Sequence, residues 1–289
     1  MNDLQNMIKT VVVTGPTATG KTALAVGLAR KFNGEIVSVD SRQVYRGMDI
    51  GSGKDISEYG EIPYHLIDIA DPATETFNLF DFCHAAYTAI ADISKRGKLP
   101  ILCGGTALYL NALLQSYELP GGKLPERQSG LPRVRQEGTE PAFSAPFKLD
   151  ALVLGVYYPR KTVRARIEAR LDARFADGMI DEVKNLNAAG VSFEKLEFFG
   201  LEYREISRYL QNQCSFDEMR TTLLNRIRQF AKRQDIFFRK MEREGIQIHW
   251  LQEAREPDPR ELINLFLSGK KLPESGFKLC ENLNGPSFT

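Results

Sequence analysis

GPTATGKT, residues 15–22, follows the apolar run VVVT and precedes ALAVGLARKF, whose apolar residues have helical spacing. The stretch matches G-x-x-x-x-G-K-[ST], the pattern of a phosphate-binding loop between a strand and a helix. Its glycines let backbone N–H groups converge on phosphate oxygens, and the positive end of the helix dipole adds to the attraction. The stretch therefore predicts a bound phosphate. It leaves open whether a phosphoryl group is transferred or the phosphate only anchors a ligand.

This predicted loop also assigns residues to ligands. In loops of this pattern the lysine contacts the terminal phosphates, and the hydroxyl residue that follows it binds magnesium. We therefore expect Lys21 on the phosphates and Thr22 on a Mg2+ cofactor. The whole predicted phosphate site consists of Gly15, Pro16, Thr17, Ala18, Thr19, Gly20, Lys21 and Thr22.

Strands alternate with helices on both sides of the loop. Apolar patterning predicts strands over 9–14, 35–40, 62–69, 99–105 and 150–158, and helices over 20–32, 78–98 and 106–116. This order predicts an α/β fold, a P-loop NTPase-like parallel sheet flanked by helices. After residue 158 the chain is expected to be mostly helical, with a last strand over 246–251. A long helix from about 216 to 244 should bury a stripe formed by Leu223, Ile227, Phe230, Phe237 and Met241.

Proline and glycine divide the chain into four expected parts. The first part of the P-loop core covers 1–118. Residues 119–149 form a Pro/Gly-rich loop, because five prolines and four glycines occur there with little apolar periodicity. A mostly helical continuation of the core covers 150–268, and a flexible tail covers 269–289.

Composition narrows the class of protein. The 289 residues are 43% hydrophobic and 26% charged with a net charge of +1, which is ordinary globular usage. The four cysteines are scattered without a C-x-x-C pattern, so neither a zinc site nor a disulfide framework is expected. The sequence shows no leader-like segment and no run of eighteen apolar residues. We therefore expect a cytoplasmic monomer without a membrane partner.

Charged residues near the expected sheet edge suggest chemistry. Asp40 ends the strand 35–40, which we place beside the loop strand, and ligands of open α/β sheets bind at the carboxyl ends of strands. Asp40 could orient magnesium, accept a proton from an acceptor, or only fix the loop. Strand 99–105 ends in Cys-Gly-Gly, where many ATPases have a magnesium-orienting Asp, which weighs against a kinase. Arg228 and Lys232, one helical turn apart, could clamp a diphosphate or RNA phosphates, or form a solvated basic face.

Five segments together resemble the tRNA dimethylallyltransferases: GPTATGKT, SVDSRQVYRGMDIGSGKD, PYHLIDIADP, GGTALYLNALL and RIRQFAKRQ. The resemblance covers about residues 10–119 and 150–251. It implies that the loop binds the diphosphate of dimethylallyl diphosphate as a leaving group. The allyl group would go to N6 of the adenosine 3′ of the anticodon, in tRNAs that read codons beginning with U. The partner would be the tRNA anticodon loop.

The resemblance also implies roles for single residues. Lys21, Arg228 and the magnesium on Thr22 would stabilise the charge that develops on the departing diphosphate. Asp40 would accept the proton of the adenine amine, and the base must be flipped out of the anticodon loop to reach it. The flipped adenosine and its neighbours would be held by Asp40, Ser41, Arg42, Gln43 and Thr106.

One departure from the family keeps alternatives open. Family members carry a helical insertion with an N-D-x-x-R-x-x-R-A-L-E segment where this chain has 119–148, and that segment is missing. A short connection favours an adenylate isopentenyltransferase acting on free AMP, ADP or ATP, whereas SVDSRQVYRGMDIG and RIRQFAKRQ favour the tRNA enzymes. A small-molecule P-loop kinase would need a second magnesium carboxylate. A non-catalytic RNA-binding paralogue would be expected to lose some of Lys21, Thr22, Asp40 and Arg228.

Overall fold

The computed structural model describes residues 7–119, 143–253 and 256–281, and its centre is a six-stranded parallel sheet. The strands are β1 (Met7–Thr14), β2 (Gly34–Ser38), β3 (Tyr64–His65), β4 (Leu99–Cys103), β5 (Lys148–Tyr157) and β6 (Ile248–Gln252). Their order is β3-β2-β4-β1-β5-β6. The predicted fold class is confirmed. Two details were wrong: β4 separates β2 from the loop strand β1, and only two residues of the expected strand 62–69 pair with the sheet.

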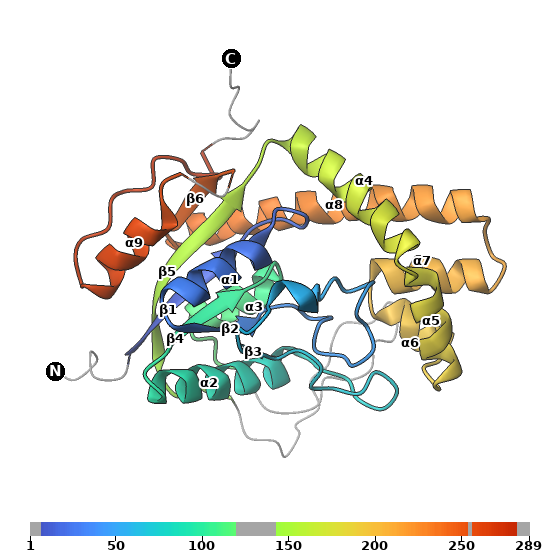
Figure 1. The fold of residues 1–289 in the computed structure, drawn as a ribbon, viewed down its shortest axis with the longest axis horizontal. Helices are drawn as coiled ribbons and strands as arrows, with labels where there is room; N and C mark the ends of the chain where they lie inside the picture. The colour runs from blue at the N-terminus through green and yellow to red at the C-terminus, as the bar shows by residue number, and fades with distance from the viewer. Residues whose placement is uncertain (1–6, 120–142, 254–255, 282–289) are drawn as a thin grey trace.

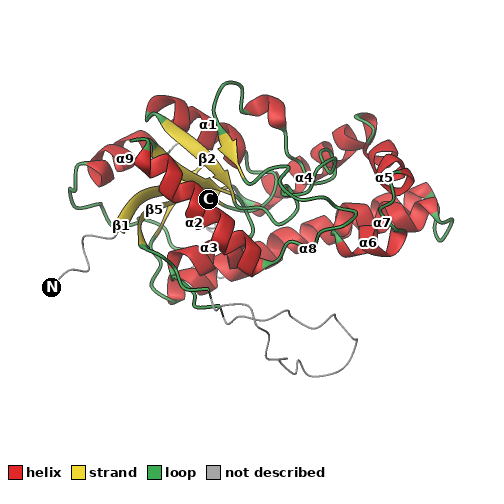
Figure 2. Cartoon of the chain, turned by 90° about the horizontal axis from the view of Figure 1, so that it is seen from below, coloured by secondary structure: helices red, strands yellow, loops and turns green. Residues whose placement is uncertain are grey.

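Helices cover both faces of the sheet (Figure 1; Figure 2). α1 (Lys21–Lys31) and α9 (Pro259–Leu267) pack on one face. α2 (Leu79–Lys95), α3 (Ala107–Leu114) and the C-terminal half of α8 (Phe216–Arg243) pack on the other. Since side chains alternate along a strand, Val12 joins the α2 side while Val11 and Val13 join the α1 side. β1 is buried on both faces, as its unbroken apolar run predicts.

A second core lies beyond the carboxyl ends of the strands. It is built by α4 (Arg160–Ala176), α5 (Met179–Ala188), α6 (Phe193–Phe198), α7 (Leu201–Leu210) and the N-terminal half of α8. The segment between β2 and β3 contributes Val44, Tyr45 and Met48 to this core, so it lies between the sheet and the helices (Figure 1). α8 belongs to both cores, through Ile227 at one end and Phe238 at the other.

Two expectations from the sequence need correction. Phe230 was placed in the buried stripe of α8, but its side chain is 40% exposed, and Ala231 is buried in its place. The tail from residue 269 was expected to be flexible, yet its described part packs on the body. Leu279 is 3% exposed, and the backbone N–H groups of Leu279 and Cys280 donate to the Glu242 carboxylate at 3.2 and 2.7 Å.

The Pro/Gly-rich segment falls largely outside the described residues, so its expected loop structure stays a prediction. Its described ends lie side by side, because Leu119 and Phe143 exchange backbone hydrogen bonds of 3.0 and 2.8 Å. Within the described parts of the chain, no helix is both long and apolar enough to cross a membrane.

Candidate active site

The predicted phosphate-binding loop connects β1 to α1, and its backbone requires glycine at two points. Gly15 and Gly20 have φ angles of 144° and 78°, in the region that side chains disfavour. A Cβ on Gly15 would lie 2.7 Å from the Val156 carbonyl oxygen, so a larger residue would push β5 away. Ala18 also has a positive φ, of 61°. Such strain is typical of loops that are shaped for a ligand rather than for stability.

Lys21 lies at the first position of α1, and its Nζ donates to the Pro16 carbonyl at 2.7 Å. The lysine is thus folded onto its own loop. Burial lowers the pKa of Lys21 to about 8; Arg170 also lowers it, while Cys103 and Asp40 raise it. The loop therefore surrounds a cation that lacks a full anionic partner. A bound phosphate would supply one.

Gln234 on α8 joins the loop to the end of β4, and sequence reasoning did not single it out. Its Oε1 accepts from the Thr17 backbone N–H at 3.0 Å, and its Nε2 donates to the Gly105 carbonyl at 2.8 Å. A Cβ on Gly105 would lie 2.5 Å from Nε2, which explains the second glycine of Cys-Gly-Gly. Gln234 is 6% exposed. A polar residue on an otherwise apolar helix stripe was the signal that could have revealed it.

The acceptor residues predicted from the sequence gather at the carboxyl ends of β2 and β4. The Asp40 carboxylate accepts from the Arg42 backbone N–H at 2.8 Å, and the Ser41 N–H donates to the Thr106 hydroxyl at 3.3 Å. Gly104 lets the strand ends meet, since a Cβ there would lie 2.1 Å from the Val39 carbonyl oxygen. Asp40 also acts on the charge of Lys21. The phosphate loop and the acceptor residues therefore belong to one site.

Gln43 behaves differently from the other acceptor residues. Its Oε1 accepts from the Ser38 hydroxyl at 2.7 Å, and its Nε2 donates to the Gly53 carbonyl at 3.0 Å. Both ends of the amide are therefore occupied within the protein. In this structure Gln43 links Ser38 to Gly53, and one Nε2 proton and one Oε1 lone pair remain for an adenosine.

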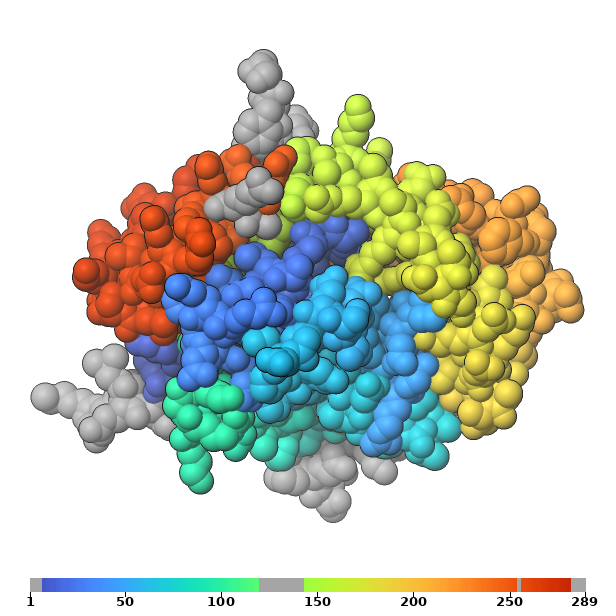
Figure 3. All heavy atoms as spheres, in the orientation of Figure 1, coloured from blue at the N-terminus to red at the C-terminus, as the bar shows by residue number. Residues whose placement is uncertain are grey.

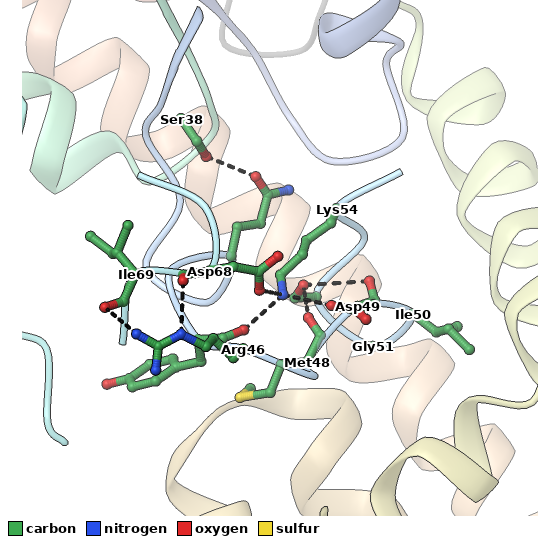
Figure 4. Close-up of polar contacts among 12 residues, drawn as sticks. Ser38, Arg46, Met48, Asp49, Ile50, Gly51, Lys54, Asp68 and Ile69 are labelled. Carbon is green, nitrogen blue, oxygen red and sulfur yellow. Dashed lines mark hydrogen bonds and ion pairs between the residues drawn. The ribbon is translucent and has the colours of Figure 1, made fainter. Parts of the chain in front are cut away.

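A buried lysine fixes the same segment through its ammonium (Figure 4). The Lys54 side chain is fully buried, and its ammonium donates to the Tyr45 carbonyl, at 2.7 Å, and to the carboxylates of Asp49 and Asp68. All three of its protons are thus used. Sequence reasoning missed Lys54, because a lysine beside glycines in SGKD gives no sign of burial.

Glu182 on α5 attaches this segment to the helices. Its carboxylate accepts from the backbone N–H groups of Asp49, Ile50 and Gly51 at 2.6–3.0 Å, and from the Tyr203 hydroxyl at 2.9 Å. Figure 3 shows the segment (blue to cyan) continuous with the surface of α5–α7 (yellow). The acceptor side is therefore held jointly by the sheet and by the second core.

A cavity of about 590 Å³ opens beside the phosphate loop, and Pro16 and Arg228 both line it. Lys232 lines it as well, so the two predicted cations of α8 face the same space. Arg228 is paired with Glu168 on α4, with 2.7 Å between Nη2 and Oε2. Asp235 also lines the cavity, and burial raises its pKa to about 6, against the effects of Arg160 and Arg239. Cations dominate the wall, which suits an anionic ligand.

Metal binding at this site would depend on the ligand. Among the described residues, no group of three or more His, Cys, Asp or Glu side chains could hold a metal ion. Mg2+ usually keeps several waters and is bound by few protein oxygens together with substrate phosphates. The Thr22 hydroxyl, on the first turn of α1 and partly exposed, fits such a site. It fits only with a phosphate in the loop.

Comparison with known sequences identifies the family. The profile of the IPP transferase family matches residues 43–145 and 130–241, and the isopentenyl transferase profile matches residues 8–61. The chain belongs to the IPP transferase family. The tRNA dimethylallyltransferase 1 of Geotalea uraniireducens is 43% identical to it, over 88% of this chain and 97% of the relative. The tRNA dimethylallyltransferase 2 of Syntrophotalea carbinolica is 44% identical, over 89% and 98%.

Solved structures of this family agree with the fold. A tRNA isopentenylpyrophosphate transferase from Bacillus halodurans has a TM-score of 0.72 at 28% identity, covering 90% of this chain and 96% of that chain. The enzyme from Staphylococcus epidermidis has a TM-score of 0.73 at 28% identity, covering 91% of this chain and 99% of that chain. The alignment with the Geotalea protein runs over 293 residues, more than the 289 of this chain. The relative therefore has residues without a counterpart here.

Proposed function

We propose that this protein is a tRNA dimethylallyltransferase. It transfers a dimethylallyl group from dimethylallyl diphosphate to N6 of the adenosine 3′ of the anticodon, in tRNAs reading codons that begin with U, and it releases diphosphate. One observation supports the proposal: Asp40 acts electrostatically on the lysine of the phosphate loop, in a chain that is 43% identical to a tRNA dimethylallyltransferase. The family membership makes prenyl transfer the chemistry to which that site is fitted.

The donor side supplies charge stabilisation. When the allylic C–O bond breaks, its electron pair stays on the diphosphate oxygen, and negative charge grows there. Loop N–H groups, Lys21 and Arg228 would stabilise this charge. The cavity that Pro16 of the loop and Arg228 line together supports this role. Arg228 would exchange Glu168 for the diphosphate, or bind both. Mg2+, held by Thr22 and the diphosphate, would add a further positive charge.

The acceptor side supplies the base. The adenine N6 attacks the allylic carbon, the C–N bond forms, and the amine must lose a proton. Asp40 takes that proton, since its carboxylate already accepts one backbone N–H and keeps its remaining lone pairs for the substrate. Ser41, Arg42 and Thr106 lie around it and would position the flipped adenosine.

The adenylate isopentenyltransferase remains the second candidate, because this chain lacks residues that the tRNA enzymes carry. A kinase has no such support, since the matched families are prenyltransferases. The deciding experiment incubates the protein with dimethylallyl diphosphate, Mg2+ and either unmodified tRNA or AMP. Mass analysis of the adenosine should show a C5H8 unit gained by tRNA. Gain by AMP alone would establish the second candidate, and ADP released stoichiometrically from added ATP would overturn prenyl transfer.

A further inference from the structure

An aromatic ring stands exposed beside the acceptor residues. Phe198 is the last residue of α6, and its side chain is 54% exposed. The next residue, Phe199, is 1% exposed and packs on the Tyr45 ring with centroids 4.5 Å apart. Two consecutive phenylalanines thus have opposite environments. The buried ring anchors the backbone. The exposed ring meets Phe199 edge-on, with centroids 6.3 Å apart, and keeps more than half of its surface in solvent.

Arg42 connects this ring to the site. Its guanidinium lies over the Phe198 ring, 6.0 Å from the centroid, and Nη2 lies 3.5 Å from the Phe198 carbonyl oxygen. Gly200 makes room, since a Cβ there would lie 3.3 Å from the Arg42 Nε. The backbone N–H of the same arginine donates to Asp40. Arg42 therefore contacts both Asp40, the proposed proton acceptor, and the exposed Phe198 ring.

The ring has a rigid support on both sides. Residues 45–54 are held by Lys54 (Figure 4) and joined to α5 and α7 through Glu182 and Tyr203. α6 and α7 follow one another around Gly200, and Phe199 fixes that corner to Tyr45. The distance from the Phe198 ring to the acceptor residues is thereby set by the fold. A rigid platform loses little conformational freedom when a ligand binds to it.

We propose that the Phe198 ring and the Arg42 guanidinium form a stacking subsite for an unpaired nucleobase adjacent to the acceptor adenosine. The inference rests on the proposed function, because it takes RNA as the acceptor. Single-stranded RNA is commonly bound by stacking its bases on aromatic rings and arginine planes, and a neighbouring cation favours the phosphates that join them. A base beside a flipped-out adenosine has lost one stacking partner, and Phe198 replaces it.

Steady-state kinetics with an unmodified RNA anticodon stem-loop test the subsite. Phe198→Ala should raise the KM for this RNA roughly 5- to 100-fold, the range expected for one base–aromatic stack. The KM for dimethylallyl diphosphate should not change. Phe198→Tyr should resemble the unchanged protein, and Phe198→Leu, which keeps apolar bulk without a ring, should resemble Phe198→Ala. Leu267→Ala is the matched control, because Leu267 is 38% exposed and lies on α9, which packs on the sheet and not in the second core with α6.

Two further arms identify the base and give a readout besides activity. Removing the base on the 5′ or the 3′ side of the acceptor adenosine should, at one position, abolish the difference between Phe198→Ala and the unchanged protein. In Phe198→Trp, the stem-loop should quench the new fluorescence. The chain has one tryptophan, Trp250, which is 2% exposed and serves as a constant background.

The outcomes separate the two proposals. If the unchanged protein transfers no prenyl group to RNA, the proposed function fails, and quenching in Phe198→Trp still reports whether a base reaches the ring. If transfer proceeds normally but Phe198→Ala leaves the RNA KM unchanged, the stacking subsite is overturned. Full activity of Phe198→Leu would also overturn it, because an apolar contact would then suffice.

Discussion

Lys21 should couple the stability of the protein to pH, and the coupling can be worked out. Its pKa is about 8 in the folded protein because of burial, against 10.5 for an ordinary lysine. Between these values the unfolded state binds the proton that the native state has released. The free energy of unfolding therefore rises with pH across this window. At 1.36 kcal/mol per pKa unit, the full rise is about 3 kcal/mol.

Lys21→Met removes this titration, so the variant and the unchanged protein should differ by an amount that depends on pH. Urea unfolding can be followed by the fluorescence of Trp250, which is buried in the fold. From pH 7 to pH 10, the stability of the unchanged protein should rise relative to Lys21→Met by about 2–3 kcal/mol. Lys21→Arg keeps a charge at both pH values and should show no such rise.

Diphosphate provides an independent check of the same reasoning. A bound anion favours protonated Lys21, so the affinity for inorganic diphosphate should fall as pH rises above about 8. Saturating diphosphate should in turn flatten the rise in stability of the unchanged protein. If the difference in unfolding free energy between Lys21→Met and the unchanged protein stays constant from pH 7 to 10, then the pKa of Lys21 is not lowered in the folded protein. That result would refute the reasoning.

Four substitutions and one comparison of RNA substrates have expected outcomes. Asp40→Asn should lower the rate of prenyl transfer roughly 10²- to 10⁴-fold with nearly unchanged diphosphate binding, and near-normal turnover would reduce Asp40 to a loop-fixing residue. Glu168→Gln frees Arg228 from its ion pair and should tighten diphosphate binding about 2- to 5-fold in titration calorimetry, whereas Arg228→Ala should weaken it. Lys54→Met should cost about 2 kcal/mol of unfolding free energy, less than a fully buried pair because Asp49 and Asp68 are 58% and 41% exposed. With 119–148 shortened, an anticodon stem-loop should be prenylated nearly as well as whole tRNA. A strong preference for whole tRNA with a steep salt dependence would contradict this.

The fold class was predictable because the sequence signals for each strand and helix lie within that strand or helix. Apolar runs ending in glycine or acid, alternating with helical periodicity, are enough to indicate a parallel sheet, and the sheet is confirmed. Strand order is not local, and β4 lies between β1 and β2 where the sequence placed the two together. The error did not displace the site, because parallel strands end at the same edge whatever their order. Asp40 therefore meets the phosphate loop across β4.

The residues that the sequence did not reveal have buried polar groups, and they hold the site through hydrogen bonds inside the protein. Gln234 bonds backbone groups of Thr17 and Gly105, which are distant in the chain. Lys54 bonds the Tyr45 carbonyl and the carboxylates of Asp49 and Asp68, which the fold brings around one ammonium. No spacing in the sequence encodes such partners. The prediction for Phe230 was wrong for another reason. A 3.6-residue period allows either residue 230 or residue 231 to follow Ile227 in the buried stripe, and only packing against the second core selects Ala231. The assigned roles of Asp40, Arg228 and the other site residues stay predictions.

The phosphate loop and the acceptor residues are held by different parts of this architecture. The phosphate loop is held by β1, α1 and Gln234, all within the sheet layer or against it. Asp40 and Arg42 begin a segment that Glu182 and Tyr203 attach to the second core. Loosening α5–α7 should therefore weaken acceptor binding before donor binding. Phe198 lies on α6 in the same second core. The second core therefore holds both the segment that carries Asp40 and the ring proposed to stack on the neighbouring nucleobase.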